Sequence, residues 1–261
     1  MQNNVMKILV CVKQVPDAES RPLIAGTDLP CIREEGIVFR MNRYDEYALE
    51  EALLLKEKYP GTVVDVISVG PERALAVLKK GLEKGADRAL LIKCDGNRPG
   101  AYETASLIAG YAKDKNYSLI FAGVMSEDLM QCQVGPMVAS FLSIPCAVSV
   151  VKISVNSGMM SVTVDSELEG VMAETVKIGM PCLLTFQTGV NQPRYPSLTN
   201  VMRARGMSPE LINDAGAGAA GLNQVTSLSY PPADIKGTTI EGNTGEKAAR
   251  LADILHEKGL I

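Results

Sequence analysis

Residues 123–135 are the stretch of this sequence best suited to binding an anionic ligand. The stretch reads Gly-Val-Met-Ser-Glu-Asp-Leu-Met-Gln-Cys-Gln-Val-Gly and joins an apolar segment to a segment of helical character. Backbone amides at the start of a helix, together with the helix dipole, favour a bound phosphate. The stretch has neither the Gly-Lys-Ser/Thr ending of a Walker loop nor a G-x-G-x-x-G pattern. The alternative interpretation is an ordinary helix start capped by Ser126 or Asp128.

The charge of this loop limits the ligand that it can accept. Glu127 and Asp128 are acidic, and residues 123–135 contain no Lys or Arg. A polyphosphate would be repelled unless another element supplied positive charge, whereas a single phosphate, as in AMP, is easier to accept. Residues 13–17, 42–45 and 69–71 are further candidate ligand segments, because ligands of open α/β sheets bind where strands end.

Residues 191–207 are suited to recognition of another protein. They contain three arginines and no acidic residue, so this segment has a charge of +3 in a chain whose net charge is −4. Prolines at 193 and 196 stiffen its start. A presented segment that is both basic and apolar suits docking to an acidic partner. The alternative is a solvated, charged turn. The residues concerned are Arg194, Tyr195, Leu198, Val201, Met202, Arg203 and Arg205.

The composition excludes several classes of catalyst and metalloprotein. The single histidine, His256, lies near the C-terminus, which excludes a mid-chain Ser-His-Asp triad and a His-rich zinc site. The six cysteines include no C-x-x-C pair and lie mostly in apolar runs. We therefore expect buried free thiols in a reducing compartment, with no catalytic residue and no metal ligand.

Charge and hydropathy also restrict partners and location. A net charge of −4 argues against a general nucleic-acid binder. No apolar run reaches the roughly 20 residues that span a bilayer, and the polar N-terminus lacks a signal-peptide core. We expect a cytoplasmic protein without membrane insertion.

Alternating strands and helices must position these segments. Short apolar runs at 7–13, 63–69, 89–92 and 119–123 predict buried strands. Helices are predicted after Asn42, after Pro71, and over 101–115 and 131–142. This alternation predicts an α/β fold with a doubly wound, mainly parallel sheet.

The pattern changes after residue 145. Residues 148–153 and 160–164 flank Asn156-Ser157-Gly158 and predict a β-hairpin, and 181–186 predicts a further strand. Residues 214–221 (DAGAGAAG) indicate a linker, and Asn243 with Glu246 forms a capping box before a final helix that runs to residue 258. We expect an α/β nucleotide-binding domain at 1–189. Residues 190–261 then form a docking loop and a tail that packs on a partner subunit.

Together these segments resemble the β subunit of electron-transfer flavoproteins over nearly the whole chain. Each motif is of moderate specificity, but their order and spacing are specific. The matching segments are 6–17 (MKILVCVKQVPD), 41–52 (MNRYDEYALEEA), 85–88 (GADR), 133–136 (QVGP), 167–170 (ELEG) with 181–185 (PCLLT), and 191–198 (NQPRYPSL).

The resemblance implies an adenine-nucleotide α-hydrolase-like fold and a heterodimer whose α subunit carries the redox FAD. It implies that this chain binds AMP, or a second FAD in flavin-bifurcating members. Tyr44 takes the aromatic position near the α-bound flavin, and Leu198 takes that of the apolar anchor that enters a dehydrogenase pocket. The implied docking residues are Arg194, Tyr195, Leu198, Met202 and Arg203. The implied nucleotide contacts are Cys11, Asn42, Arg43, Tyr44, Asp45, Val69, Gly123, Ser126, Asp128, Gln131, Gln133 and Val134.

The nucleotide loop departs from the family pattern G-[KR]-Q-A-I-D-G-D-T-x-Q-V-G-P. Val124 and Met125 replace the basic-Gln pair, and residues 129–131 replace G-D-T. Arg43 stands where the family has Pro, and we expect it to supply the phosphate charge that the loop lacks.

The leading hypothesis is an electron carrier that accepts electrons from acyl-CoA-type flavin dehydrogenases and passes them on. One alternative is a bifurcating subunit that holds its own FAD. Another is a stand-alone adenine-nucleotide-binding regulatory module like the universal stress proteins.

Overall fold

The computed structural model describes residues 5–20, 23–25, 31–94, 99–168, 172–212, 225–230 and 237–261. These residues belong to two compact units. The first comprises residues 1–23 and 32–224, and the second comprises residues 24–31 and 225–261. The predicted linker at 214–221 and part of the 167–170 motif lie outside the described residues.

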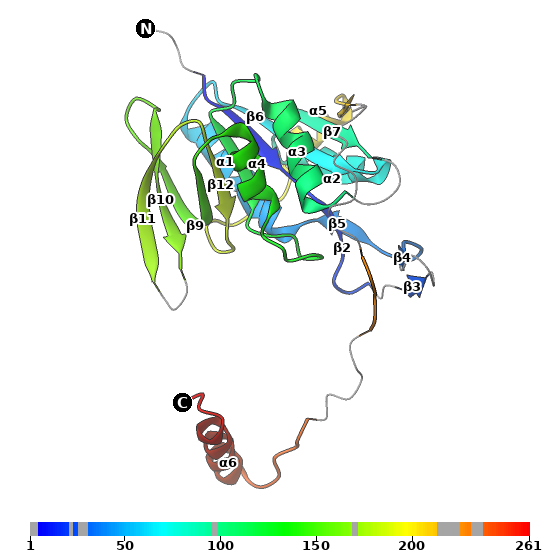
Figure 1. The fold of residues 1–261 in the computed structure, drawn as a ribbon, viewed down its shortest axis with the longest axis vertical. Helices are drawn as coiled ribbons and strands as arrows, with labels where there is room; N and C mark the ends of the chain where they lie inside the picture. The colour runs from blue at the N-terminus through cyan, green and yellow to red at the C-terminus, as the bar shows by residue number, and fades with distance from the viewer. Residues whose placement is uncertain are drawn as a thin grey trace. The chain divides into compact units, whose positions relative to one another are not determined.

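A nine-stranded sheet, in the order β11-β10-β9-β12-β8-β1-β6-β7-β13, forms the first unit (Figure 1). Each neighbouring pair among β9, β12, β8, β1, β6, β7 and β13 is parallel. β10 pairs antiparallel with both β9 and β11. The predicted doubly wound sheet and its hairpin extension are thus confirmed. The strands are β1 (Lys7–Cys11), β6 (Val63–Gly70), β7 (Arg88–Lys93), β8 (Leu119–Gly123), β9 (Cys146–Val155), β10 (Ser161–Glu167), β11 (Ala173–Gly179), β12 (Cys182–Phe186) and β13 (Glu210–Ile212).

Helices cover both faces of this sheet. Alternate residues of β1 point to opposite faces: Ile8 and Val10 pack with α1 (Arg43–Lys58) and α2 (Leu75–Lys84), and Leu9 packs with α3 (Ala101–Ala112) and α4 (Val134–Leu142). The short helix η1 (Glu72–Ala74) precedes α2, and α5 (Leu198–Arg205) packs on α2. Burial on both faces explains why the strands were visible as continuous apolar runs.

Short ribbons complete the strand content. β2 (Gln14–Pro16) pairs antiparallel with β5 (Phe39–Met41), and β3 (Leu23–Ala25) pairs with β4 (Cys31–Arg33). The amide of Asn42, which follows β5, donates to the carbonyl of Lys13, which precedes β2, at 2.9 Å. The ribbon therefore brings residues 13–17 beside the start of α1.

The chain order places a topological switch point between β1 and β8. From β1 the chain proceeds outward to β6 and β7, and β8 then returns to the other side of β1. In open α/β sheets the crevice outside the carboxyl ends of the strands at such a point is the usual ligand site. We call this place the switch crevice, flanked by residues 12–13 after β1 and by the loop 123–133 after β8.

The later part of the chain contains elements that the sequence patterns did not predict. Helix α5 and strand β13 follow residue 189 yet belong to the first compact unit. The final helix, α6 (Thr244–Glu257), lies in the second unit and has the predicted capping box. The Asn243 Oδ1 accepts from the Glu246 amide at 3.0 Å, and the Asn243 amide donates to the Glu246 Oε2 at 2.9 Å. None of the helices in the described part of the chain combines the length and apolar character needed to cross a bilayer.

Candidate functional site

Asp45 joins the two strands that border the switch crevice. Its Oδ2 accepts from the Lys13 amide at 2.7 Å, and its Oδ1 accepts from the Gly123 amide at 3.0 Å. The residue is only 6% exposed. This burial raises the pKa of the Asp45 carboxyl to about 7, although the hydrogen bonds from both amides oppose the shift. One carboxylate in the first turn of α1 thus fixes the ends of β1 and β8 relative to each other.

Gly123 is required where β8 ends because α1 approaches the backbone closely. A Cβ atom at position 123 would lie 2.5 Å from the Asp45 Oδ1 and 2.5 Å from the Tyr44 Cβ. No side chain fits there without displacing the start of α1. The family glycine at this position therefore has a steric reason in this chain.

Asn42 and Glu127 hold the loop against the start of α1. Asn42 precedes α1, but its side chain makes no capping bond. Instead its Nδ2 donates to the Met125 carbonyl at 2.8 Å, and its Oδ1 accepts from the Glu127 amide at 3.1 Å. The Glu127 carboxylate accepts from the Arg43 amide at 3.1 Å and from the Arg40 Nη2 at 2.9 Å. A residue of the loop thus caps α1 and stabilises the positive end of its dipole.

Lys13 spans the switch crevice. Its Nζ lies 2.6 Å from the Asp128 Oδ1 and 3.1 Å from the Ser126 Oγ. The loop acids are therefore paired, Asp128 with Lys13 and Glu127 with Arg40. The sequence patterns placed Lys13 in a candidate segment but did not single it out, since its distance from the loop is set by the sheet order.

Other predictions for this loop have mixed outcomes. The alternative interpretation, in which Ser126 or Asp128 caps the following helix, is wrong, because α4 begins at Val134 with Gln133 as its N-cap residue. Arg43 is exposed, and it contacts Glu127 through its backbone amide. Its role toward a phosphate remains a prediction.

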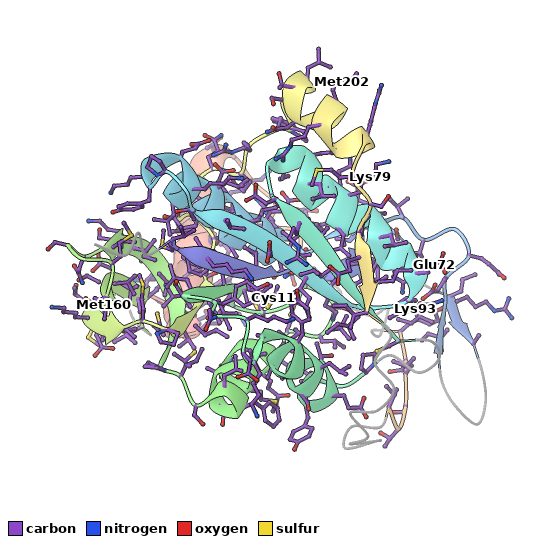
Figure 2. The ribbon with its side chains drawn as sticks, turned by 90° about the horizontal axis from the view of Figure 1, so that it is seen from above. Cys11, Glu72, Lys79, Lys93, Met160 and Met202 are labelled. Carbon is purple, nitrogen blue, oxygen red and sulfur yellow. The ribbon has the colours of Figure 1, made fainter. Side chains whose placement is uncertain are left out.

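The remaining predicted nucleotide contacts lie around the same edge of the sheet. Cys11 and Val69 pack in the core on the α3/α4 face, and burial raises the pKa of the Cys11 thiol, so it stays neutral. Figure 2 shows Cys11 inside the body of the domain. Gln131 and Gln133 are exposed and Val134 is half-buried. In the described residues, no group of three His, Cys, Asp or Glu side chains could hold a metal ion.

The segment at 191–207 is fixed to α1 by a buried salt bridge. The Arg194 Nη2 lies 2.8 Å from the Glu50 Oε1, and its Nε lies 2.9 Å from the Glu50 Oε2. The Arg194 amide also donates to the Glu50 Oε2 at 3.0 Å, and its Nη1 contacts Glu57. Glu50 is buried, so this arginine points inward and anchors the segment.

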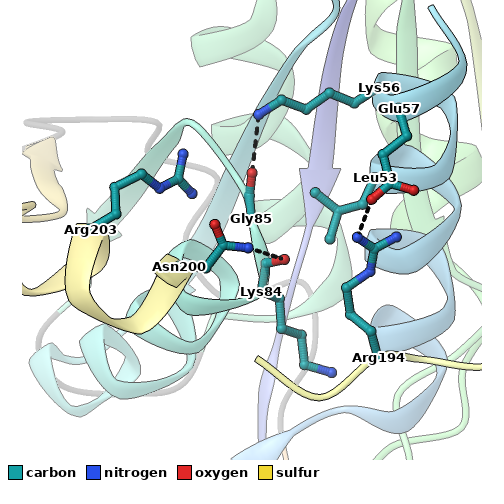
Figure 3. A pocket seen from close by; sticks show the side chains of 8 residues that line it. All are labelled: Leu53, Lys56, Glu57, Lys84, Gly85, Arg194, Asn200 and Arg203. Carbon is teal, nitrogen blue, oxygen red and sulfur yellow. Dashed lines mark hydrogen bonds and ion pairs between the residues drawn. The ribbon is translucent and has the colours of Figure 1, made fainter. Parts of the chain in front are cut away.

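A groove of about 280 Å³ lies beside this anchor (Figure 3). Two cations of the lining bind the C-terminal end of α2. The Arg203 Nη2 donates to the carbonyl of Leu82 in α2 at 3.2 Å, and the Lys56 Nζ donates to the carbonyl of Gly85, the C-cap residue, at 3.1 Å. These cations cap a helix C-terminus, where positive charge is favourable. The groove is lined by Leu53, Lys56, Glu57, Lys84, Gly85, Arg194, Asn200 and Arg203.

Apolar side chains form the exposed part of the same segment. Tyr195 is 95% exposed, Leu198 78% and Met202 54%. Figure 2 shows Met202 on α5, on the side away from the sheet. We call Tyr195, Leu198 and Met202 the apolar patch. The structure thus separates two groups of side chains within residues 191–207. Arg194 binds Glu50 and Arg203 binds backbone carbonyls of residues 82 and 86, while the patch faces solvent.

Comparison with known proteins decides the family. A model described as "Electron transfer flavoprotein domain" matches residues 31–217. The electron transfer flavoprotein subunit beta of Methylophilus methylotrophus is 34% identical, covering 97% of this chain and 98% of the relative. The subunit beta of Bacillus subtilis is 31% identical, covering 98% of this chain and 100% of the relative. This chain belongs to the electron transfer flavoprotein β-subunit family.

A further relative belongs to a named enzyme complex. The caffeyl-CoA reductase-Etf complex subunit CarD of Acetobacterium woodii is 34% identical, covering 98% of this chain and 100% of the relative. Such near-full-length similarity confirms the resemblance and the expected role in electron transfer. It leaves the stand-alone regulatory module without support. For a β subunit of this family, the switch crevice and the apolar patch are the two surfaces whose roles need assignment.

Proposed function

We propose that this chain pairs with an α subunit to form a heterodimeric, FAD-containing electron carrier, and that it binds AMP in the switch crevice. The crevice carries this proposal because its parts fit a mononucleotide. It lies at a topological switch point, its loop leads into the N-terminus of α4, and Gly123 leaves no side chain at the strand end.

The charges at the crevice favour one phosphate over several. The loop carboxylates of Glu127 and Asp128 are paired with Arg40 and Lys13. A phosphate therefore does not meet unpaired acids, but neither does it meet the surplus of cations that a polyphosphate needs. This balance supports AMP over a second FAD, which is the bifurcating alternative.

The apolar patch is the proposed docking site for a flavin-dependent dehydrogenase. Exposed aromatic and aliphatic side chains at the centre of a small patch are typical binding anchors. We assign Leu198 as the central anchor, flanked by Tyr195 and Met202. Arg194 and Arg203 hold the patch in place through contacts within the chain.

Helix α6 is the proposed contact with the α subunit. It has no buried residue in the described structure, although Leu251, Ile254 and Leu255 lie within it. A helix with apolar side chains and no core of its own gains stability by packing on a partner. The predicted docking loop and tail at residues 190–261 remain part of this proposal, although α5 and β13 belong to the first compact unit.

This chain contributes binding and positioning. Bound FAD supplies the redox chemistry in such a carrier. We assign no acid–base catalytic role to any residue of this chain and place it in the cytoplasm. Among the described cysteines, Cys11 and Cys182 are buried free thiols as expected, which supports a reducing compartment, whereas Cys132 and Cys146 are exposed, so the expectation of burial is wrong for them.

Two experiments test these assignments. Mass spectrometry of the nucleotide released from the purified complex should find AMP in a 1:1 ratio to this chain. Recovery of a second FAD would favour the bifurcating alternative, and an absence of nucleotide would refute the proposed site.

Leu198→Asp tests the docking patch. This change should slow flavin reduction by the dehydrogenase about tenfold or more, while flavin content stays unchanged. Val5→Asp is the control, because Val5 is 57% exposed and precedes β1, outside residues 191–207. Equal reduction rates for Leu198→Asp and wild type would reject the docking role.

A further inference from the structure

Lys13 is the cation that lies directly across the switch crevice. It follows β1 on one side, and its Nζ reaches Ser126 and Asp128, which follow β8 on the other side. Its side chain is 38% exposed, so a ligand in the crevice can reach the ammonium. An ammonium group has three N–H donors, and the two described contacts use two of them.

We propose that Lys13 recognises the ligand phosphate and that Asp128 holds its ammonium in place and competes with the phosphate for it. This inference rests on the proposed binding of a mononucleotide in the crevice. It differs from the expectation that Arg43 supplies the phosphate charge, because the charged groups of Arg40 and Arg43 are placed differently from the Lys13 ammonium.

Neither arginine is placed as Lys13 is. Arg40 contacts both Glu127 and Asp17, at 2.9 Å and 3.2 Å, so two carboxylates already neutralise it. Arg43 is exposed and meets the loop through its backbone amide. Lys13 alone among these three has its charged group in contact with the side chains of residues 126 and 128.

Because Asp128 pairs with Lys13, a substitution of Asp128 should raise the affinity for phosphate, whereas most substitutions in a binding site lower affinity. In the free protein the Asp128 carboxylate occupies the ammonium, and a phosphate must share or displace that contact. Removal of the Asp128 charge should therefore strengthen phosphate binding. Removal of the Lys13 charge should weaken it and should not affect binding of the uncharged nucleoside.

The test uses titration calorimetry on the complex with its α subunit, freed of bound nucleotide, with AMP and adenosine as the two ligands. Lys13→Met should weaken AMP binding about 10- to 100-fold, the value of one charge-assisted hydrogen bond, and leave adenosine binding unchanged. Lys13→Arg should retain AMP binding. Asp128→Asn should strengthen AMP binding several-fold without changing adenosine binding.

Lys80 and Glu83 provide matched controls. They form a pair at 2.8 Å in the second half of α2, and Glu83 has the same side-chain exposure as Asp128, 14%. Lys80→Met and Glu83→Gln should change neither affinity. Adenosine binding also verifies that each variant is folded around the crevice.

Each outcome decides the proposal. Unchanged AMP affinity in Lys13→Met would overturn the role of Lys13 while leaving the nucleotide site intact, and a loss confined to Arg43→Met would assign that role to Arg43. Equal losses of AMP and adenosine binding in Lys13→Met would show a purely structural role. Weaker AMP binding in Asp128→Asn would refute the competition. A wild-type complex that binds neither ligand would overturn the nucleotide site itself.

Discussion

The salt bridge between Glu50 and Arg194 offers a sharp test of how the apolar patch is held. Arg194→Met removes the guanidinium group and keeps much of the aliphatic stem. The Glu50 side chain, only 5% exposed, would lose the partners at 2.8 and 2.9 Å and keep the bond from the backbone amide of residue 194. The variant therefore leaves a buried carboxylate without a compensating charge.

The expected cost is about 3 kcal/mol of unfolding free energy. Breaking a buried ion pair by removing one partner costs about 3–5 kcal/mol. The low end applies because the Arg194 side chain is 27% exposed and retains some hydration. The second contact, with the exposed Glu57, adds no more than about 1 kcal/mol.

Equilibrium urea unfolding measures this cost. Lys80→Met serves as the control, since it breaks a pair whose lysine is 63% exposed and should cost less than about 1 kcal/mol. In a double-mutant cycle, adding Glu50→Gln to Arg194→Met should recover about 2 kcal/mol, because Gln carries no charge to leave unpaired. Trypsin should also cleave after Arg203 and Arg205 faster in Arg194→Met than in wild type.

Two results would refute this reasoning. If Arg194→Met unfolds within 1 kcal/mol of wild type, the buried pair is not what fixes the segment. If the two substitutions are simply additive, Glu50 and Arg194 are not coupled in solution.

Three further variants test the crevice and the tail. Gly123→Ala should lower the unfolding free energy by about 1–3 kcal/mol, because the new Cβ would lie 2.5 Å from atoms of Asp45 and Tyr44. Thermal unfolding measures this loss. The same variant should also reduce the nucleotide content of the complex. The pKa of the Asp45 carboxyl is about 7 in the folded chain, against a reference value of 3.8. Between pH 3.8 and about 7 the folded chain therefore binds more protons than the unfolded chain, so wild-type stability should fall as the pH rises through this range. Asp45→Asn should remove this pH dependence, and an unchanged slope would show that another group causes it. Asn243→Ala should lower the stability of α6 by about 1 kcal/mol, seen as lost helical circular dichroism, and leave the first unit unchanged because α6 buries no residue.

Local patterns were sufficient for most of the parallel sheet. The run at 119–123 matches β8 residue for residue, and Asn156-Ser157-Gly158 lies between the antiparallel strands β9 and β10. The capping box at Asn243 also formed as expected. These features depend on neighbours within a few residues, so burial periodicity and turn chemistry specify them directly.

Short or polar elements were missed for the same physical reason. β13 has three residues and pairs with β7 at the edge of the sheet. α5 has eight residues and follows a segment with prolines at 193 and 196, which does not predict a helix. Their stability comes from packing on α2 and β7. Tertiary contacts override weak local preference in such segments.

Sequence patterns alone were sufficient to predict the fold class and the family of the chain, and the phosphate-binding role of residues 123–135 stays a prediction. Tertiary structure decided which charges are available. Glu127 caps a helix whose first residue lies 84 positions earlier, Lys13 meets Asp128 across 115 positions, and Glu50 meets Arg194 across 144. Such pairs arise from strand order and helix packing, which no local pattern encodes. They pair both acids of the loop with cations and bind Arg194 and Arg203 to groups of the same chain, leaving an apolar patch exposed.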